Sequence, residues 1–391
     1  MKTLIELYDE RPVENVLASE VFKPERTVFL CPPEIAQNKN LRVKLEEYFR
    51  HRGLNTELIF LECSQYNSEK IEKQLRAITE KYSDCVLDIT GGTDAALFAG
   101  GRLCAEYGTP TFTYSRKRNC FFSIHDADFA NELSCDVIHS VEDCFLMAGG
   151  ALRQGRVDNS ILSSYMNDID PFFKLYLRNR SNWSHIVGYI QRASQSEKGF
   201  TPPLDVTAPY TVKGERGSQI AVPESALYEL QKLGFISNVE ISADSVKFRF
   251  KDHQIRTWLR DMGSVLELFV YKACIDTGLF NDVRTSAVVD WEGDNKQDNV
   301  TNEIDVMAMK GIVPVFISCK TCEVTTEALN ELAILRDRFG GNIAKAAIVT
   351  TKCCQNITRH RASELGIAVI DLDDIKLGNT KTLIESLMKN N

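Results

Sequence analysis

The sequence has no hydrophobic run approaching the roughly 18 residues that a membrane-spanning helix needs. Its first residues, MKTLIELYDERP, also lack the apolar stretch of a secretory signal peptide. No low-complexity tract interrupts the 391 residues, and 43% hydrophobic with 26% charged residues is typical of a globular protein. We therefore expect a cytoplasmic protein of two or three domains.

An excess of positive charge is also missing, since the net charge is −8. This argues against a protein coated with basic residues to grip duplex DNA. It does not exclude a nuclease, because metal sites are built from carboxylates and a local basic groove is enough to hold a strand.

Paired cysteine motifs are scarce, although the chain has twelve cysteines. Cys319 and Cys322 form a single CxxC, and Cys353 and Cys354 are adjacent. A structural zinc site usually needs two well-spaced ligand pairs. We interpret most cysteines as small, reduced core residues.

Residues 1–150 alternate strand-like and helix-like segments, which predicts a Rossmann-like, doubly wound parallel sheet with helices on both faces. The expected strands are residues 3–9, 27–33, 56–62, 85–90 and 109–115, and the expected helices are 41–53, 68–83 and 94–108.

Residues 151–252 break this pattern. We expect an apolar helix near 161–177, a proline-containing loop at 198–218, a helix at 224–236, and a hairpin formed by 239–244 and 246–251. Helix followed by hairpin suggests a small winged-helix-like connector. The alternative is a plain connector that sets the domain geometry.

Residues 253–391 predict a compact α/β/α unit with a mixed sheet. Its expected segments are one long helix at 255–278, strands at 283–291, 302–310 and 313–321, a helix at 326–341, a strand at 344–351, a helix at 357–366 and a strand at 367–372.

A cluster of charged residues is expected on the hairpin of this last unit. Strand alternation puts Glu303 and Asp305 on one face, and Ser318 and Lys320 on one face of the next strand. If the strands pair through the KGIVP turn, two carboxylates and a lysine converge. Such carboxylates can hold a hard divalent cation, and the lysine can stabilise charge that develops on a phosphodiester.

Glu267 extends this cluster. It lies on the long preceding helix at the edge of an apolar stripe, one turn after Gly263, whose small size would permit close approach to the sheet. A carboxylate at the border of a buried face needs a partner, and a metal is one.

Together these residues resemble the PD-(D/E)xK nuclease superfamily: a helix glutamate, a hairpin aspartate, then a strand ending in x-x-Lys. The position two before Lys320 is usually acidic in that pattern, and here it is Ser318. Glu303, or Glu327 on the following helix, is a candidate for the missing carboxylate, and the backbone carbonyl of Cys319 is a candidate metal ligand.

The segment DITGGTDAALFAGG leads from a strand into a helix in the N-terminal unit. Glycines let the backbone approach a ligand, and the N–H groups at a helix N-terminus favour anionic or hydroxyl-rich ligands. The segment is neither a Walker A motif nor GxGxxG, so NAD binding and nucleotide hydrolysis are poorly supported. We see no general acid–base pair nearby that would degrade a bound ligand.

With ERPVENVL, DITGGTDAAL and NEID…SCK in one chain, the sequence resembles the CARF–nuclease effectors of type III CRISPR systems. The resemblance implies a homodimer whose CARF domains (residues 1–150) bind cyclic tetra-adenylate. It also implies that binding activates a Mn²⁺- or Mg²⁺-dependent endonuclease (residues 253–391) that degrades single-stranded RNA and DNA in antiviral defence.

Carried onto this sequence, the resemblance assigns three sets of residues. The ligand set is Asn15, Thr90, Gly91, Gly92, Thr93, Thr113, Tyr114, Ser115 and Arg116. The catalytic set is Glu267, Glu303, Asp305 and Lys320. The metal set is Glu267, Glu303, Asp305 and the carbonyl of Cys319. Two other functions stay open: a ligand-gated nucleic-acid-binding regulator with an inactive nuclease domain, and a nuclease without allostery.

Overall fold

The structure is a computed structural model that describes residues 1–153, 155, 157–195, 202–214, 217–294, 296 and 298–389. Parts of the loop expected at 198–218, namely 198–201 and 215–216, lie outside the described residues. Among the described helices, none combines the length and the apolar character that crossing a bilayer requires.

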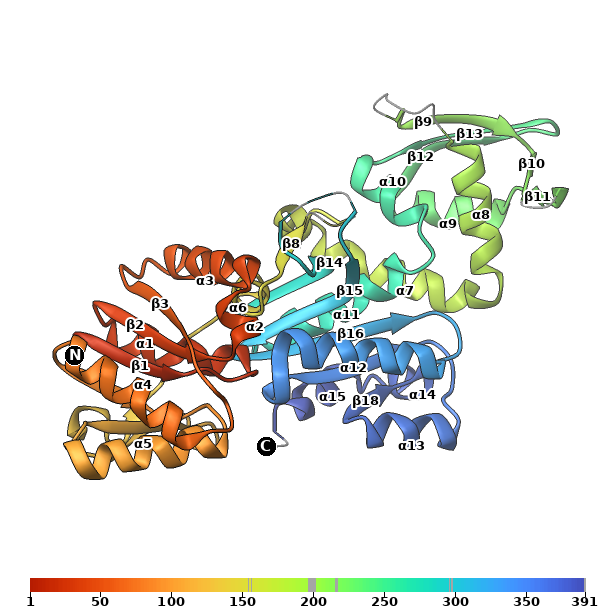
Figure 1. The fold of residues 1–391 in the computed structure, drawn as a ribbon. Coiled ribbons are helices and arrows are strands. Elements are labelled where there is room, and N and C mark those ends of the chain that lie inside the picture. Colours follow the sequence, from red (N-terminus) through yellow and green to blue (C-terminus); the bar gives the residue numbers. More distant parts are fainter. Residues whose placement is uncertain are drawn as a thin grey trace.

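The N-terminal unit is built on a seven-stranded sheet in the order β3-β2-β1-β4-β5-β6-β7 (Figure 1). The first five strands in that order are parallel, as predicted, and β6 and β7 add an antiparallel edge that was not predicted. The strands are β1 (Thr3–Leu7), β2 (Arg26–Cys31), β3 (Glu57–Glu62), β4 (Cys85–Asp88), β5 (Thr111–Ser115), β6 (Cys120–His125) and β7 (Leu133–Ser134).

Helices cover both faces of this sheet, which confirms the predicted α/β layering (Figure 1). They are η1 (Pro12–Asn15), α1 (Leu17–Phe22), α2 (Pro33–Ala36), α3 (Lys39–His51), α4 (Ser68–Lys81) and α5 (Asp94–Tyr107). The three longest begin at capping side chains, Asn38, Asn67 and Thr93, whose oxygens accept backbone N–H groups of the first turn. These caps fix where α3, α4 and α5 start relative to the strand ends.

The middle segment forms helices and two small antiparallel sheets, ordered β12-β13-β9 and β10-β11. Its elements are η3 (Asn159–Tyr165), α7 (Met166–Asn179), η4 (Arg180–Asn182), α8 (Trp183–Ala193), β9 (Asp205–Pro209), β10 (Thr211–Lys213), β11 (Gln219–Ala221), α9 (Glu224–Lys232), β12 (Ile236–Ile241) and β13 (Ser245–Phe250). The predicted helix and hairpin are present as α9, β12 and β13.

The expectation of a loop across 198–218 is wrong for β9 and β10. The strand β9 pairs with β13, and its Val206 and Ala208 point into the core while their neighbours are exposed. The prolines at 202, 203 and 209 suggested a loop, but the first two precede this edge strand and Pro209 is its last residue, where a missing N–H costs little. A helix, a hairpin and this third strand agree with the winged-helix-like interpretation, which stays a prediction.

The C-terminal unit has a mixed six-stranded sheet in the order β18-β17-β16-β15-β14-β8. The strands are β8 (Ala151–Arg153), β14 (Asp282–Asp290), β15 (Thr301–Lys310), β16 (Val313–Lys320), β17 (Lys345–Thr350) and β18 (Ile367–Ile370). Its helices are α10 (His253–Leu259), α11 (Ser264–Thr277), α12 (Thr326–Gly340), α13 (Asn356–Glu364), α14 (Leu372–Lys376) and α15 (Thr380–Leu387). The predicted α/β/α layers are confirmed.

The single long helix expected at 255–278 is in fact two helices, α10 and α11. Asp261 causes the break, because its Oδ1 accepts the N–H groups of Gly263 and Ser264 at 2.9 and 2.7 Å and the hydroxyl of Ser264 at 3.0 Å. An aspartate that bonds the backbone ahead of it favours a helix start over a helix interior. The apolar periodicity continued across the break and concealed it.

The predicted boundary at 150/151 falls inside a packed region. The helix α6 (Val141–Met147) packs its Phe145 against Phe316 and Phe339 of the C-terminal unit. The strand β8 then pairs with β14 at the edge of the C-terminal sheet. The last residues of the predicted sensor domain and the first of the predicted connector therefore contribute to the core of the C-terminal unit.

Candidate active site and ligand cavity

The hairpin β15–β16 brings the predicted acidic and basic residues together. Its register pairs Val306 with Ile317, and continuing the pairing one residue outward places Asp305 opposite Ser318. Both side chains line a pocket beside α12. Asp305, Ser318 and Lys320 come together as predicted. Ile304, which strict alternation would place on the face opposite Asp305, nevertheless lines the same pocket and belongs to the core cluster of α12.

Asp305 is the centre of this arrangement. Its Oδ2 accepts the N–H of Cys319 at 2.6 Å and the hydroxyl of Ser318 at 3.1 Å, and it lies 3.7 Å from Lys320 Nζ. Burial raises the pKa of Asp305, although Lys320 and these two hydrogen bonds oppose the rise and Glu303 adds to it. A carboxylate in such surroundings gains from any additional cation.

A small pocket of about 60 Å³ opens beside Asp305. The hairpin contributes Glu303, Asp305, Ser318 and Lys320 to its walls, and α12 contributes four further residues. The α12 residues are Ala328, Glu331, Leu332 and Leu335. Three of the four predicted catalytic residues therefore share one pocket.

Glu267 lies on the separate helix α11. It is 4% exposed, and its Oε2 is 3.5 Å from the hydroxyl of Ser286. Glu267 does not line the pocket of Asp305. Both carboxylates nevertheless lie near Cys319, and its thiol pKa is raised mainly by burial and further by the charges of Asp305 and Glu267. Gly263 makes room for Glu267 rather than for the sheet, because a Cβ there would lie 2.7 Å from Glu267 Oε1.

The pocket offers oxygen atoms as metal ligands, which are the ligands that hard divalent cations prefer. Carboxylate and hydroxyl oxygens of Asp305, Glu303 and Ser318 line it, and the Oδ1 of Asp305 takes part in no hydrogen bond found among the described residues. Within the same described part of the chain, no three His, Cys, Asp or Glu side chains are grouped as a metal cluster. Ser318 stands where the PD-(D/E)xK pattern usually has an acidic residue, so one carboxylate ligand is missing from the pocket.

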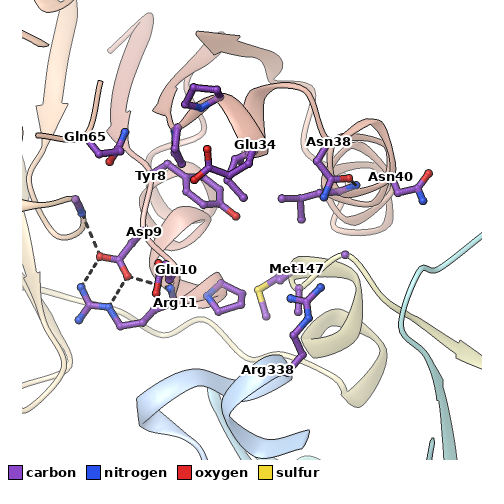
Figure 2. Close-up of a pocket in the computed structure, with 18 of the residues that line it drawn as sticks. Tyr8, Asp9, Glu10, Arg11, Glu34, Asn38, Asn40, Gln65, Met147 and Arg338 are labelled. Atoms are coloured by element: carbon purple, nitrogen blue, oxygen red, sulfur yellow. Dashed lines mark hydrogen bonds and ion pairs between the residues drawn. The ribbon is translucent and has the colours of Figure 1, made fainter. Parts of the chain in front are cut away.

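A much larger cavity, of about 1050 Å³, lies at the carboxyl edge of the N-terminal sheet (Figure 2). The ends of β1, β2 and β3 and the turn after β4 line it, together with α2, α3 and the end of α6. Trp291, Glu292 and Arg338 reach it from the C-terminal unit. The carboxyl ends of parallel strands are where ligands bind in such sheets.

Of the nine predicted ligand residues, the cavity lining includes Gly92 and Thr93. The glycines are explained by packing, since a Cβ at Gly91 would lie 2.7 Å from Cβ of Asp9. Gly92 has φ 92°, and its N–H donates to Asp9 Oδ2 at 3.1 Å. The hydroxyl of Thr93 caps α5 and donates to the carbonyl of Gln65 at 2.6 Å. The GGT turn thus shapes the cavity wall.

The other predicted ligand residues serve the fold around the cavity. Asn15 exchanges two 2.8 Å hydrogen bonds with the backbone of Asp9. Thr90 accepts the N–H of Tyr114 at 2.8 Å, and Arg116 pairs with Glu14 at 2.6 Å. Thr113 and Ser115, on the same strand, are likewise absent from the lining, so these residues stay ligand predictions that this cavity does not support.

Sequence reasoning missed most of the residues that do line the cavity. They include Tyr8, Asp9, Glu10, Arg11, Glu34, Asn38, Ser64, Gln65 and Tyr66. A signal was available, because the rule that singled out the turn after β4 applies equally to the ends of β1, β2 and β3. The contributions from the C-terminal unit carry no local signal, since only tertiary packing brings them there.

An internal ion pair already occupies one wall of the cavity. Arg11 holds both carboxylate oxygens of Asp9 at 2.6 Å (Figure 2). Arg11 also pairs with Glu14 at 2.7 Å. Burial tends to raise the pKa of Asp9, but the hydrogen bonds from Arg11 and Gly92 outweigh it and lower the pKa. Asp9 is therefore charged and neutralised by Arg11.

Two solved structures share the fold over almost the whole chain. The crystal structure of protein VC1899 from Vibrio cholerae has a TM-score of 0.73 at 17% identity, covering 99% of this chain and 98% of that one. Can2 from Sulfobacillus thermosulfidooxidans, in complex with cyclic tetra-adenylate, has a TM-score of 0.67 at 17% identity, with the same two coverages. No curated protein matches in sequence.

A family model described as Card1-like, endonuclease domain, matches residues 254–390. The match spans β14, β15, β16 and α12, and with them the pocket of Asp305 and Lys320. Residues 254–390 are therefore similar to Card1-like endonuclease domains, and the whole chain shares its α/β fold with VC1899 and Can2.

Proposed function

We propose that this protein is a cyclic tetra-adenylate-activated, metal-dependent endonuclease that degrades single-stranded RNA and DNA in type III CRISPR antiviral defence. The observation that carries the proposal is the Asp305–Lys320 pair, 3.7 Å apart, in a pocket of the Card1-like endonuclease domain. Can2, whose fold this chain shares, was solved with that cyclic nucleotide.

In the catalytic pocket, Asp305 would hold a divalent cation, with Glu303, Glu267 or the carbonyl of Cys319 as further ligands. Such a cation activates water and polarises a phosphodiester when bound. Lys320 places its ammonium beside the scissile phosphate and stabilises the charge that develops there. Ser318 and the N–H of Cys319 fix the Asp305 carboxylate in the orientation this needs.

The large cavity supports the sensor half of the proposal. Tyr8, Tyr66 and Trp291 line it, and aromatic rings stack on nucleobases. Asn38 and Gln65 also line it, and their amides can both donate to and accept from base edges. Its volume and this mixture of rings and amides fit a nucleotide ligand.

We further propose a homodimer, with α5 as part of the interface. Leu97 and Phe98 on this helix are 37% and 62% exposed. They follow the GGT turn directly, so pairing through α5 would place two cavities close together.

The proposal is tested by incubating labelled single-stranded RNA and DNA with Mn²⁺, with and without cyclic tetra-adenylate. We expect cleavage that needs the cyclic nucleotide and falls on the order of 100-fold in Asp305→Ala and in Lys320→Ala. Lys376→Ala, on the exposed side of α14, is the matched control and should cut normally. Equal cleavage with and without activator would remove the sensor and leave a nuclease without allostery.

A second function is favoured by Ser318, which leaves the acidic set one residue short. In that case the domain would be an inactive nuclease in a ligand-gated regulator that binds nucleic acid. No cleavage in any lane, combined with binding of labelled strands that responds to cyclic tetra-adenylate, would support this alternative.

A further inference from the structure

The endonuclease domain contributes one cation, Arg338, to the wall of the large cavity. The residue lies in the last turn of α12, and its guanidinium extends from that helix toward the side of the cavity that carries Tyr8 and Met147 (Figure 2). Its side chain is exposed to the space of the cavity. It is therefore available to a bound molecule.

Within the described part of the chain, the guanidinium of Arg338 has no hydrogen bond and no ion pair, and it lies 5.4 Å from the centre of the Phe339 ring. The surrounding protein lowers the pKa of Arg338 by desolvation, and the nearby Tyr8 hydroxyl opposes this. An arginine side chain stays charged in proteins, so an uncompensated cation faces the cavity.

The charges on the other walls of the cavity restrict where a phosphate group can bind. The charge of Arg11 is neutralised by its ion pairs with Asp9 and Glu14. Three further carboxylates line the walls and make them negative, namely those of Glu10, Glu34 and Glu292. A phosphate group is repelled by those carboxylates and is favoured only near Arg338. The charge pattern thus favours a phosphate group beside Arg338, with Tyr8 next to it.

The same helix also lines the catalytic pocket. Ala328, Glu331, Leu332 and Leu335 of α12 line the pocket of Asp305 and Lys320. Arg338 follows Leu335 by about 5 Å along the helix axis and Ala328 by about 15 Å. Leu332 and Phe339 pack α12 against the sheet through Phe316. A displacement of Arg338 is therefore carried by a packed helix to the wall of the catalytic pocket.

We propose that Arg338 binds a phosphodiester group of the activator, so that occupation of the cavity acts on α12 and through it on the catalytic pocket of the same chain. This inference rests on the proposed function, in which a cyclic nucleotide occupies the cavity. A guanidinium suits this role because its fork of donors matches phosphate oxygens bidentately. The contact changes activity only if it is stronger in the active arrangement.

The test uses the full-length protein with cyclic tetra-adenylate as the probe. Affinity is measured by calorimetry at several salt concentrations, and cleavage of labelled single strands is measured at saturating activator. We compare Arg338→Ala, Arg338→Lys and the control Lys381→Ala, whose lysine lies on the exposed face of α15. Thermal unfolding checks that each variant is folded.

We expect Arg338→Ala to weaken binding about 10- to 100-fold, as the loss of a charge-assisted hydrogen bond does. The affinity should also depend less on salt, which loss of packing alone would not cause. Arg338→Lys should recover part of both, and Lys381→Ala should match the wild type. Maximal cleavage at saturating activator should fall in Arg338→Ala.

Two failures are distinguishable. Wild-type protein that neither binds cyclic tetra-adenylate nor responds to it would overturn the proposed function and this inference together. Wild-type protein that binds and responds, while Arg338→Ala keeps the same affinity, salt dependence and maximal rate, would overturn this inference alone. Weaker binding with an unchanged maximal rate would keep the phosphate contact and overturn the coupling through α12.

Discussion

At the residue scale, Ser318 determines how much negative charge the catalytic pocket holds. Its hydroxyl donates to Asp305 Oδ2 at 3.1 Å, in a place where a carboxylate would instead repel that oxygen. The neighbouring Lys320 and the N–H of Cys319 also contact this Oδ2 atom of Asp305. The pocket is thus balanced for one well-partnered aspartate.

Replacement of Ser318 by aspartate tests this balance. In Ser318→Asp, two carboxylates face each other, so the protein in chelator should unfold at a lower temperature than the wild type. Added Mn²⁺ should then stabilise the variant more than the wild type, because a cation relieves the repulsion and gains a ligand. Thermal unfolding over a Mn²⁺ titration measures both effects. Identical Mn²⁺ responses of the two proteins would show that position 318 does not face the cation.

The residues of the catalytic hairpin were predictable because a strand has a period of two. Once Glu303 and Asp305 are placed on a strand, their shared face follows, and the same holds for Ser318 and Lys320. The side of approach of Glu267 did not follow, because it depends on which face α11 covers. The position of Arg338 beside the large cavity could not be predicted either, because it depends on how α12 packs against the N-terminal unit.

At the element scale, the break between α10 and α11 positions Glu267. Asp261 fixes the start of α11, and Gly263 leaves the space that Glu267 Oε1 occupies. The elements themselves were largely predictable, since strands and helices of the two α/β units follow clear periodicities. The break and the edge strand β9 were not, because an aspartate bond and a tertiary strand pairing overrode the local pattern.

Gly263→Ala is a sharp test of this positioning. The added Cβ would lie 2.7 Å from Glu267 Oε1, so the carboxylate must move. Alanine is also a poorer N-cap than glycine, which costs up to about 1 kcal/mol of stability. We expect cleavage to fall about 10-fold with a small change in unfolding temperature, as a displaced catalytic group produces. Glu267→Gln measured beside it should show a loss at least as large. If Gly263→Ala cuts normally while Glu267→Gln does not, the carboxylate acts from its displaced position as well.

At the scale of the whole molecule, two chains are expected to pair through the N-terminal units. The exposed Phe98 and Leu97 on α5 are the apolar residues that such pairing would cover. Large apolar side chains exposed side by side mark interaction surfaces more often than isolated ones.

Phe98→Asp should therefore shift the protein from dimer to monomer in analytical ultracentrifugation. The matched control is Ile357→Asp. Ile357 lies on α13 of the C-terminal unit and is 75% exposed. A charge buried in an interface costs several kcal/mol, enough to dissociate most dimers at micromolar concentration. A dimer that survives Phe98→Asp and dissociates in Ile357→Asp would move the interface to the endonuclease domain.

The placement of α6 and β8 has a consequence for how such proteins can recombine. Residues 141–153 precede the segment that matches the endonuclease family, yet they supply Phe145 to its core and an edge strand to its sheet. An effector domain transferred to another sensor by a cut at 253 would leave behind this strand and expose Val289, Phe316 and Phe339. A functional transfer of this domain must therefore include the segment that begins at Val141. The part of the chain that the domain needs for folding is larger than the segment that matches the family.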